Sequence, residues 1–359
     1  MSEVEYTIPR GSKILVTGAN GFIGSNIVDQ LLSLGFFVRG TVRETKSWLN
    51  DLFDKKYGKG RFETCIVSDI TSQVQWKRAS DGVTGIIHAA ADLSMNPDPS
   101  VVIPNAIKAT LNILEAASQQ STVKGFVLTS SSTAAYMPSP DKEGIVITTG
   151  TLHEDPTLHI FSSDTILDTW NDSSISAAWD ENIPAHAKGY IVYGASKTEA
   201  ERAAFKWIEE NDRPFIFNTV LPGITFGKIL APEIRGSTQS LINNILKGDS
   251  SVLDFLPPQW YVNAADAARL HVAALLSPDI KFERIFAFAA PHNWKEVIEI
   301  LRKLRPDNSL IPPAPENPRR DLSDVIPSRR AEEILQRFFN RSGWVGLEES
   351  ISEGISGVE

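Results

Sequence analysis

The chain has 359 residues, of which 42% are hydrophobic and 22% charged, and its formal net charge is −9. This composition is typical of a globular protein with a sizeable core, and the negative charge argues against a general nucleic-acid binder, which needs a basic face. The single cysteine, Cys65, excludes a disulfide within the chain and a cysteine-based metal cluster, so we expect no metal site.

The N-terminal sequence MSEVEYTIPRG is polar and acidic. It lacks the basic and apolar regions of a signal peptide, and no apolar run in the chain approaches the roughly 18 residues that a membrane span needs. We therefore expect a cytoplasmic protein that does not contact membranes.

Short apolar runs alternate with helical patterns along the first two-thirds of the chain. The expected strands are 13–17, 36–42, 63–67, 85–88, 125–128 and 215–220, and the clearest helices are 22–34, 107–118 and 196–210. Such alternation implies parallel strands joined by right-handed helical crossovers. The sequence therefore predicts an α/β fold with a doubly wound parallel sheet.

Two segments interrupt this alternation. Residues 138–189 are rich in Ser, Thr, Asp and Pro, and proline punctuates the chain after Gly223. We expect a sheet domain over 1–222 that carries an irregular insertion at 138–189, and a smaller interleaved lobe over 223–359. Because open α/β sheets bind ligands beyond the carboxyl ends of their strands, both irregular parts are expected near a substrate.

The segment VTGANGFIG places Gly18, Gly21 and Gly24 between the first strand and the first helix. Gly18 is suited to a tight turn with positive φ, Gly21 lets a pyrophosphate approach the backbone, and Gly24 lets the helix pack on its strand. The helix N-terminus attracts phosphates. The pattern predicts a Rossmann dinucleotide site, with cofactor contacts from the whole turn: Gly18, Asn20, Gly21, Phe22, Ile23 and Gly24.

The end of the second strand indicates which dinucleotide binds. Enzymes that use NAD usually place an acid there for the ribose 2′-hydroxyl, whereas this chain has Val42 followed by Arg43. A guanidinium pairs well with a phosphate, which a carboxylate would repel. Lys46 adds a second cation, so the sequence favours NADP(H).

The segment VYGASK places Tyr193 four residues before Lys197 on a helical stretch, so both side chains face the same way. A free phenol has a pKa of about 10. A nearby ammonium and an oxidised nicotinamide ring would lower the pKa of Tyr193 and fit it for proton transfer. Tyr190 is expected on a different face of the helix.

The segment FVLTSSSTAAY ends an apolar strand in a run of hydroxyls. One of them would hold a substrate carbonyl oxygen and stabilise the developing alkoxide. Counting from the strand places Ser131 at the tip, and counting back from Tyr136 places Ser132 there. We favour Ser131 as the catalytic hydroxyl and expect Ser132 to contact substrate.

Together, the motifs VTGANGFIG, IIHAAAD, FVLTSSS, VYGASK and VLPGITFG resemble the extended short-chain dehydrogenases/reductases. VRGTVR and SKTEAERAAFKW resemble the dihydroflavonol-reductase-related group, and within it the fungal NADPH-dependent aldehyde and ketone reductases. The resemblance implies further cofactor-binding positions: Asp69, Ile70, Ala89, Ala90, Thr129, Leu221, Pro222, Gly223 and Ile224.

One position departs from this family. Many relatives carry an asparagine on the helix before the serine strand, where it completes a proton relay. Here Ala106 aligns with that asparagine, and Asn105 lies one residue away, rotated by roughly 100°. Asp266 and His271 match a family motif that we interpret as structural.

The sequence therefore predicts NADPH-dependent reduction of an aldehyde or ketone, with catalytic residues Ser131, Tyr193 and Lys197. The predicted partner is a small carbonyl compound, with Phe226, Leu256 and Trp260 lining its pocket, and the protein is expected to be a monomer or homodimer. Two alternatives stay open at this point: a sugar-nucleotide epimerase or dehydratase of the same superfamily, and a regulator that senses NADP(H) without turnover.

Overall fold

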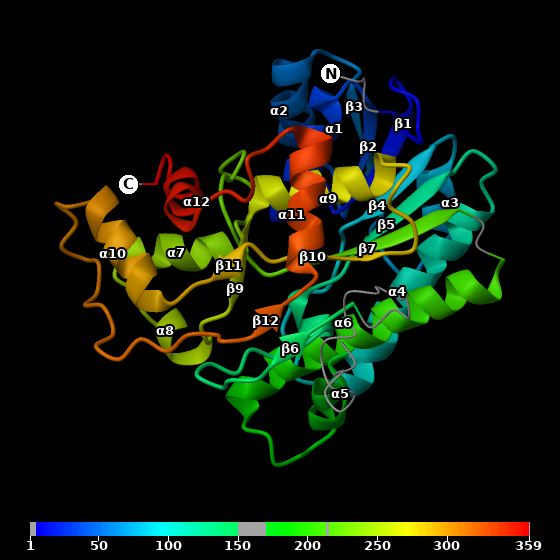
Figure 1. The fold of residues 1–359 in the computed structure, drawn as a ribbon. Helices are drawn as coiled ribbons and strands as arrows, with labels where there is room; N and C mark the ends of the chain where they lie inside the picture. The colour runs from blue at the N-terminus through cyan, green and yellow to red at the C-terminus, as the bar shows by residue number, and fades with distance from the viewer. Residues whose placement is uncertain (1–4, 150–169, 213–214, 359) are drawn as a thin grey trace.

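The computed structural model describes residues 5–149, 170–212 and 215–358. Its centre is a seven-stranded sheet with the order β10-β7-β5-β4-β1-β2-β3, in which every neighbouring pair is parallel (Figure 1). The predicted doubly wound sheet is therefore confirmed. Its strands are β1 (Lys13–Thr17), β2 (Phe37–Val42), β3 (Phe62–Ile66), β4 (Gly85–His88), β5 (Gly125–Thr129), β7 (Ile216–Pro222) and β10 (Arg284–Ala287).

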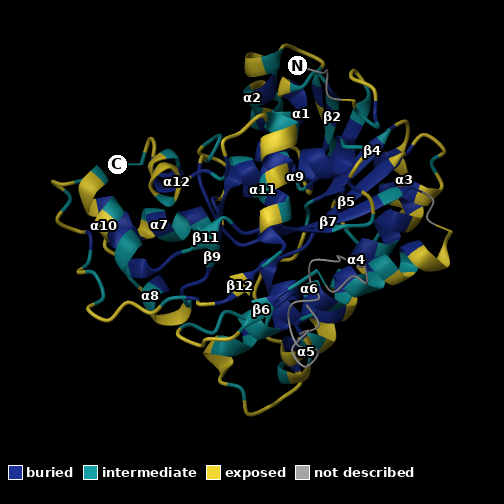
Figure 2. Cartoon of the chain, viewed as in Figure 1, coloured by how far each residue is buried: buried dark blue, intermediate teal, exposed yellow. Residues whose placement is uncertain are grey.

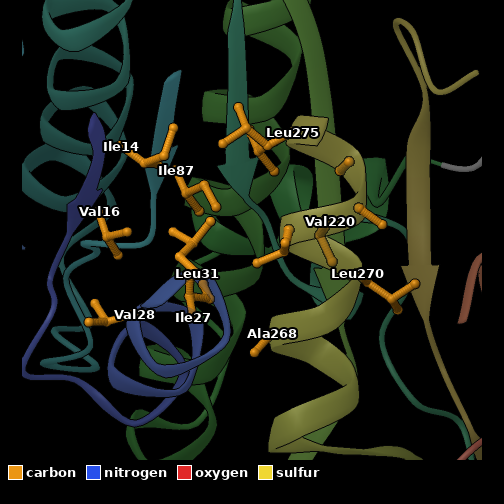
Figure 3. Close-up of a cluster of buried hydrophobic side chains, with 14 of the residues drawn as sticks. Ile14, Val16, Ile27, Val28, Leu31, Ile87, Val220, Ala268, Leu270 and Leu275 are labelled. Atoms are coloured by element: carbon orange, nitrogen blue, oxygen red, sulfur yellow. The ribbon is translucent and has the colours of Figure 1, made fainter. Parts of the chain in front are cut away.

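Successive side chains of each strand point to opposite faces of the sheet, and both faces are buried. In β1, for example, Ile14 and Val16 pack on one face and Leu15 on the other. Figure 3 shows the first face, where Ile14, Val16 and Ile87 meet apolar side chains of the covering helices. That face is covered by α1 (Phe22–Ser33), α2 (Ser47–Tyr57), α9 (Ala264–Leu276) and α11 (Ser328–Phe339), and the other by α3 (Gln73–Ser80), α4 (Pro99–Ser118) and α6 (Ala185–Glu210).

The sheet has a topological switch point between β1 and β4. The chain runs outward from β1 through β2 to β3, and then crosses back to β4 and continues in the other direction. Loops after the two central strands therefore diverge, and ligands of open α/β sheets bind at such a point, beyond the carboxyl ends of the strands. Gly18 follows β1, Ala89 follows β4 and Ser130 follows β5, so the predicted site residues lie along this edge.

The later part of the chain builds a second lobe with its own apolar core. In this lobe a three-stranded sheet of order β11-β9-β8 packs against short helices. In Figure 1 these helices lie together, away from the large sheet. The elements of this lobe are β8 (Ile224–Phe226), α7 (Thr238–Leu246), α8 (Val252–Phe255), β9 (Trp260–Asn263), β11 (Ala290–Pro291), α10 (Trp294–Leu304) and α12 (Leu347–Gly354).

The two parts of the chain are interleaved. After β8 and β9 the chain returns to the large sheet through α9, β10 and α11, and a small parallel ladder pairs β6 (Val146–Ile147) with β12 (Asp324–Val325). A division at residue 222 stays a prediction, as does the assignment of 223–359 mainly to a substrate-binding lobe. The middle of the predicted insertion, 150–169, lies outside the described residues.

Two helices begin earlier than the sequence predicts. α4 begins at Pro99 because Asp98 caps it, accepting a hydrogen bond from the Ser100 amide, and because proline suits a first helical position. α6 begins at Ala185 and is preceded by α5 (Asp172–Ala178), which packs beside it.

In Figure 2 the strands are buried, while the exposed residues gather on helix surfaces and loops. Across the described ranges, no helix has the length and apolar character needed to cross a membrane.

We expect Gly24→Ala to destabilise the first turn of α1. A Cβ atom at Gly24 would lie 2.2 Å from the carbonyl oxygen of Gly18, an atom of the turn itself. Such a clash forces the backbone to shift, and overpacking of this kind costs about 1–3 kcal/mol. Urea unfolding measures the change in the free energy of unfolding.

Gly346→Ala is the control, because an added Cβ there meets nothing within 4 Å. As Gly346 occupies the N-cap of α12, its replacement is expected to cost below about 1 kcal/mol. Equal decreases in the free energy of unfolding of the two variants would contradict the close packing inferred at Gly24.

Candidate active site

The glycine turn after β1 has the backbone shape that the sequence predicts. Gly18 has a φ of +66°, and Gly21 is the N-cap of α1. A Cβ on Gly18 would lie 3.1 Å from the Ala90 Cα, and one on Gly24 would collide with the Gly18 carbonyl. The turn, the start of α1 and the segment after β4 are therefore packed backbone to backbone, and glycine at 18 and 24 allows this. Of the turn residues, Gly18, Asn20, Gly21 and Ile23 are partly exposed, and Phe22 and Gly24 are buried.

A hydrogen-bond bridge joins the ends of β1 and β4. The Thr17 hydroxyl accepts from the Ala90 amide at 2.9 Å and lies 2.9 Å from Nδ1 of His88. Burial lowers the pKa of His88 to about 3, and the Lys197 ammonium contributes, so this imidazole is neutral. Ala89 and Ala90 are half-buried beside the glycine turn, where the resemblance places the cofactor cleft.

The basic residues of β2 and its following loop differ in their surroundings. Arg39 is held by Glu63 and by the carbonyl oxygens of Ala79 and Asp81, so its role is structural. Arg43, just beyond the strand end, is exposed. Lys46 forms an ion pair of 2.9 Å with Glu44. Arg43 and Lys46 therefore remain the candidate cations for a ribose phosphate.

The next strand, β3, leads to two of the predicted cofactor-binding residues, Asp69 and Ile70. The Asp69 side chain is exposed and accepts two hydrogen bonds from Thr71, which lower its pKa. The Ile70 carbonyl accepts from the indole of Trp76 at 2.7 Å. These local contacts fix the loop after β3, at the same edge of the sheet as the glycine turn.

The end of β5 and the middle of α6 meet at the predicted catalytic residues. Tyr193 and Lys197 lie one turn apart on α6. The Lys197 Nζ donates to the backbone carbonyl of Thr129 at 3.1 Å, and the Ser131 side chain is the hydrogen-bonding neighbour that lowers the pKa of the Tyr193 phenol against the effect of burial. The structure therefore brings together Ser131, Tyr193 and Lys197, although they are separated along the chain.

The geometry separates the two serine candidates. The Ser131 hydroxyl contacts Tyr193 and also accepts from the Thr133 amide at 3.2 Å and from the Thr133 hydroxyl at 2.9 Å. Ser132 begins a short 3-10 turn, Ser132–Ala134, and its carbonyl accepts from the amides that follow. Both serines are buried, but it is Ser131 that adjoins the phenol.

Burial dominates the protonation of the two α6 side chains. It raises the pKa of Tyr193, against the effect of the hydrogen bond with Ser131. It lowers the pKa of Lys197 to about 8, against the attraction of the Glu201 carboxylate. The sequence predicted that a nearby ammonium and an oxidised nicotinamide ring would lower the pKa of the Tyr193 phenol. In the protein without cofactor, burial instead raises this pKa. Tyr193 is therefore a neutral phenol that holds its proton.

The prediction that Tyr190 lies on a different face of α6 from Lys197 is wrong. It lies seven residues before Lys197, which is close to two full turns of a helix. Burial raises the pKa of Tyr190, and the neighbouring Tyr193 raises it further, while a hydrogen bond with Gln259 opposes them. Tyr190 is therefore beside Tyr193, on the side toward the second lobe.

The chain passes from the sheet into the second lobe immediately after β7. Leu221, Pro222, Gly223 and Ile224 are all buried along this passage. A Cβ at Gly223 would lie 2.4 Å from the carbonyl oxygen of Trp260, so glycine allows β8 and β9 to pack against the end of β7.

The three predicted pocket residues are placed differently. Phe226 has no exposed surface and packs between Tyr261 and His292 in the core of the second lobe, which argues against its assignment to a pocket wall. Leu256 and Trp260 are half-buried. The Trp260 indole donates to the Ser323 hydroxyl at 3.0 Å.

Three other residues have the structural settings that the sequence suggested. Asn105 is exposed on α4, so nothing in its placement restores the asparagine relay. Asp266 accepts from the Val345 amide and pairs with Arg269. The Nδ1 of His271 faces the Ala267 carbonyl at 2.7 Å and therefore carries the proton, which leaves Nε2 to accept from the Thr129 hydroxyl at 2.8 Å.

One residue beside the site was not predicted from the sequence: Glu201, a buried carboxylate one further turn along α6. The four-residue spacing from Tyr193 to Lys197 continues to this residue, which is the signal that could have found it.

The comparisons with known proteins agree with this architecture. The model of the NAD dependent epimerase/dehydratase family matches residues 14–157. Ketoreductase nvfG of Aspergillus novofumigatus is 42% identical over 357 residues, which are 99% of each chain. Aldehyde reductase 2 of Sporidiobolus salmonicolor is 38% identical over 360 residues, covering 98% of each.

A solved structure has the same fold. Yeast methylglyoxal/isovaleraldehyde reductase Gre2, in complex with NADPH, superposes with a TM-score of 0.74 at 18% identity, over 96% of this chain and 98% of that one. The motifs, the fold and these relatives lead to one conclusion: the chain belongs to the NAD dependent epimerase/dehydratase family, the extended short-chain dehydrogenases/reductases.

Proposed function

We propose that this protein reduces an aldehyde or ketone to an alcohol with NADPH, and that Tyr193 donates the proton. The observation that carries the proposal is the junction of β5 and α6, where the neutral phenol of Tyr193 contacts Ser131 and Lys197 is anchored one turn away. The similarity to a ketoreductase and an aldehyde reductase over nearly the whole chain supports the reaction class.

The chemistry divides between the cofactor and the protein. NADPH supplies the hydride when it is bound at this edge of the sheet. Ser131 would hold the carbonyl oxygen beside the phenol, and Tyr193 would give its proton to that oxygen as negative charge develops. Lys197, fixed by the Thr129 carbonyl, would stabilise the phenolate that remains.

The described residues fit a dinucleotide with a 2′-phosphate. The glycine turn at the N-terminus of α1 suits the pyrophosphate, and the exposed Arg43 with Lys46 offers positive charge where an NAD enzyme has an acid. The residues proposed to hold NADP(H) are the glycine turn 18–24, Arg43, Lys46, Asp69, Ile70, Ala89, Ala90, Thr129, Tyr193, Lys197 and 221–224.

The alternatives are less well supported. A dehydratase of this family needs an acid–base pair just after the catalytic hydroxyl, where this chain has Thr133, Ala134 and Ala135, all buried. An epimerase usually retains NAD, which Val42 and Arg43 disfavour. A regulator without turnover would not need the Tyr193–Lys197 pair.

Four expectations stay predictions from the sequence. They are a small carbonyl compound as the partner, no contact with nucleic acid or membranes, a cytoplasmic location, and a monomeric or homodimeric state.

Tyr193→Phe is expected to lower kcat for carbonyl reduction by about 10²–10⁴-fold, because it removes the general acid. NADPH binding, measured by fluorescence titration, should change little. Tyr190→Phe is the matched control, since its phenol lies on the same side of α6 but Ser131 adjoins Tyr193. Full turnover by Tyr193→Phe would refute the assignment.

Ser131→Ala and Ser132→Ala separate the two candidate hydroxyls. Loss of the Ser131 hydroxyl should lower kcat/KM by about 10²–10³-fold, as for other groups that stabilise a developing oxyanion. Ser132→Ala should lower it by less than about tenfold. The reverse order would move the catalytic role to Ser132.

Arg43→Ala should weaken NADPH binding by about tenfold to a hundredfold, because a charged hydrogen bond to phosphate is worth about 1.5–3 kcal/mol. The affinity for NADH should change by less than about threefold, since NADH lacks the 2′-phosphate. Arg337→Ala, which removes an exposed arginine of α11, is the control. Equal weakening for both cofactors would argue against a phosphate contact.

A further inference from the structure

Helix α6 carries a third ionisable side chain on the same face as Tyr193 and Lys197. Glu201 follows Lys197 by four residues, so the three side chains occupy successive turns of one helix face. Glu201 has no exposed surface. A fully buried carboxylate is costly unless it is paired and hydrogen-bonded, so its surroundings need an explanation.

Both carboxylate oxygens of Glu201 are held by two donors each. Oε1 accepts from the Thr219 hydroxyl at 2.6 Å and from the Arg284 Nε at 2.9 Å. Oε2 accepts from the Ser130 hydroxyl at 2.7 Å and from the Arg284 Nη2 at 3.2 Å. These donors come from three neighbouring strands, β10, β7 and the end of β5, so the carboxylate is fixed in position as one partner of a buried ion pair.

The same strand end holds the Lys197 ammonium. The Thr129 carbonyl accepts from Lys197, and the next residue, Ser130, donates to Glu201. The residue after that, Ser131, contacts Tyr193. Three consecutive residues of one strand end therefore each contact a different one of the three α6 side chains.

We propose that Glu201, clamped by Arg284, is a positioning residue for the proposed reaction: its buried negative charge keeps Lys197 in the ammonium form, and its bond to Ser130 fixes the strand end that presents Ser131. The inference rests on the proposed function for its catalytic consequence. The effect on Lys197 itself does not depend on turnover.

The charges around Lys197 agree with this role. Burial lowers the pKa of Lys197 to about 8, and Glu201 opposes the fall. Burial, with the Lys197 charge contributing, lowers the pKa of His88 on β4 to about 3 and that of His271 on α9 to about 4, so both imidazoles are neutral near pH 8. Tyr193 is a neutral phenol, and Arg284 on β10 pairs with Glu201.

The test is Glu201→Gln, which keeps the size of the side chain and removes its charge. Loss of a nearby negative charge lowers the pKa of both an ammonium and a phenol. We expect Lys197 to titrate about one pH unit lower. The readout is the pH dependence of trace acetylation of Lys197 by acetic anhydride in the full-length, cofactor-free protein, followed by mass spectrometry.

Carbonyl reduction supplies the second readout. It needs protonated Tyr193 and Lys197, so kcat/KM falls as rising pH removes their protons. In Glu201→Gln this alkaline limb should move to lower pH by the same amount, with kcat/KM near pH 6 within about threefold of the unsubstituted protein. An unmoved limb would overturn the proposal.

Two single variants separate charge from structure. Glu199→Gln makes the same chemical change on α6 at a partly exposed position that pairs with Arg202, and it should leave the titration of Lys197 unchanged. Arg284→Gln breaks the same buried ion pair but leaves the Glu201 carboxylate in place. The pH at which Lys197 titrates is therefore not expected to fall in this variant. A downward shift in Arg284→Gln equal to that in Glu201→Gln would show that the broken pair, not the lost charge, is the cause, and would overturn the proposal.

Because Glu201→Gln leaves a buried guanidinium without its partner carboxylate, it risks failing to fold. The double variant Glu201→Gln with Arg284→Gln removes both charges and should still lower the pH at which Lys197 titrates. Lys197 titrating as in the unsubstituted protein would overturn the proposal. If the unsubstituted protein reduces no carbonyl compound, the proposed function fails, while the acetylation result still decides the role of Glu201.

Discussion

The hydrogen bond from the Lys197 ammonium to the Thr129 carbonyl joins α6 to the end of β5, and the candidate site depends on this junction. Parallel strands bring their carboxyl ends to one edge of a sheet, so a helix anchored there is placed relative to β1, β4 and β7 as well. Because the anchor is a backbone atom of a central strand, the positions of Tyr193 and Lys197 are tied to the rigid sheet rather than to a surface loop.

The run Thr129 to Ser131 shows how one strand end serves several neighbours. The Thr129 hydroxyl bonds His271 on α9, its carbonyl holds Lys197, Ser130 bonds Glu201, and Ser131 meets Tyr193. Each of these polar groups is paired with a different side chain of α6 or α9, as a low-dielectric site requires. A sequence of hydroxyls that looks redundant is therefore a set of distinct contacts.

The sequence predicted where the strands of the large sheet up to β7 lie along the chain and that they are parallel, because buried parallel strands are apolar runs with clear glycine turns. It also predicted that Ser131, Tyr193 and Lys197 would meet, since each follows from a local motif. It placed Tyr190 on the wrong face of α6 and assigned Phe226 to a pocket wall. It missed Glu201 because the partners of that carboxylate, Ser130, Thr219 and Arg284, lie far apart along the chain and are brought together only by the sheet. The second lobe, with strands of two to four residues, offers too short a pattern for such prediction.

The most direct test of the account follows the transferred hydrogen. The protein is incubated with an aryl ketone or an aldehyde and with NADPH carrying deuterium at C4 of the nicotinamide, each C4 epimer in turn. The account predicts that one epimer delivers its deuterium to the carbinol carbon of the product alcohol, with one NADP⁺ released for each alcohol formed. Cofactor that is not consumed across a panel of carbonyl compounds, or alcohol that carries no deuterium with either epimer, would contradict it.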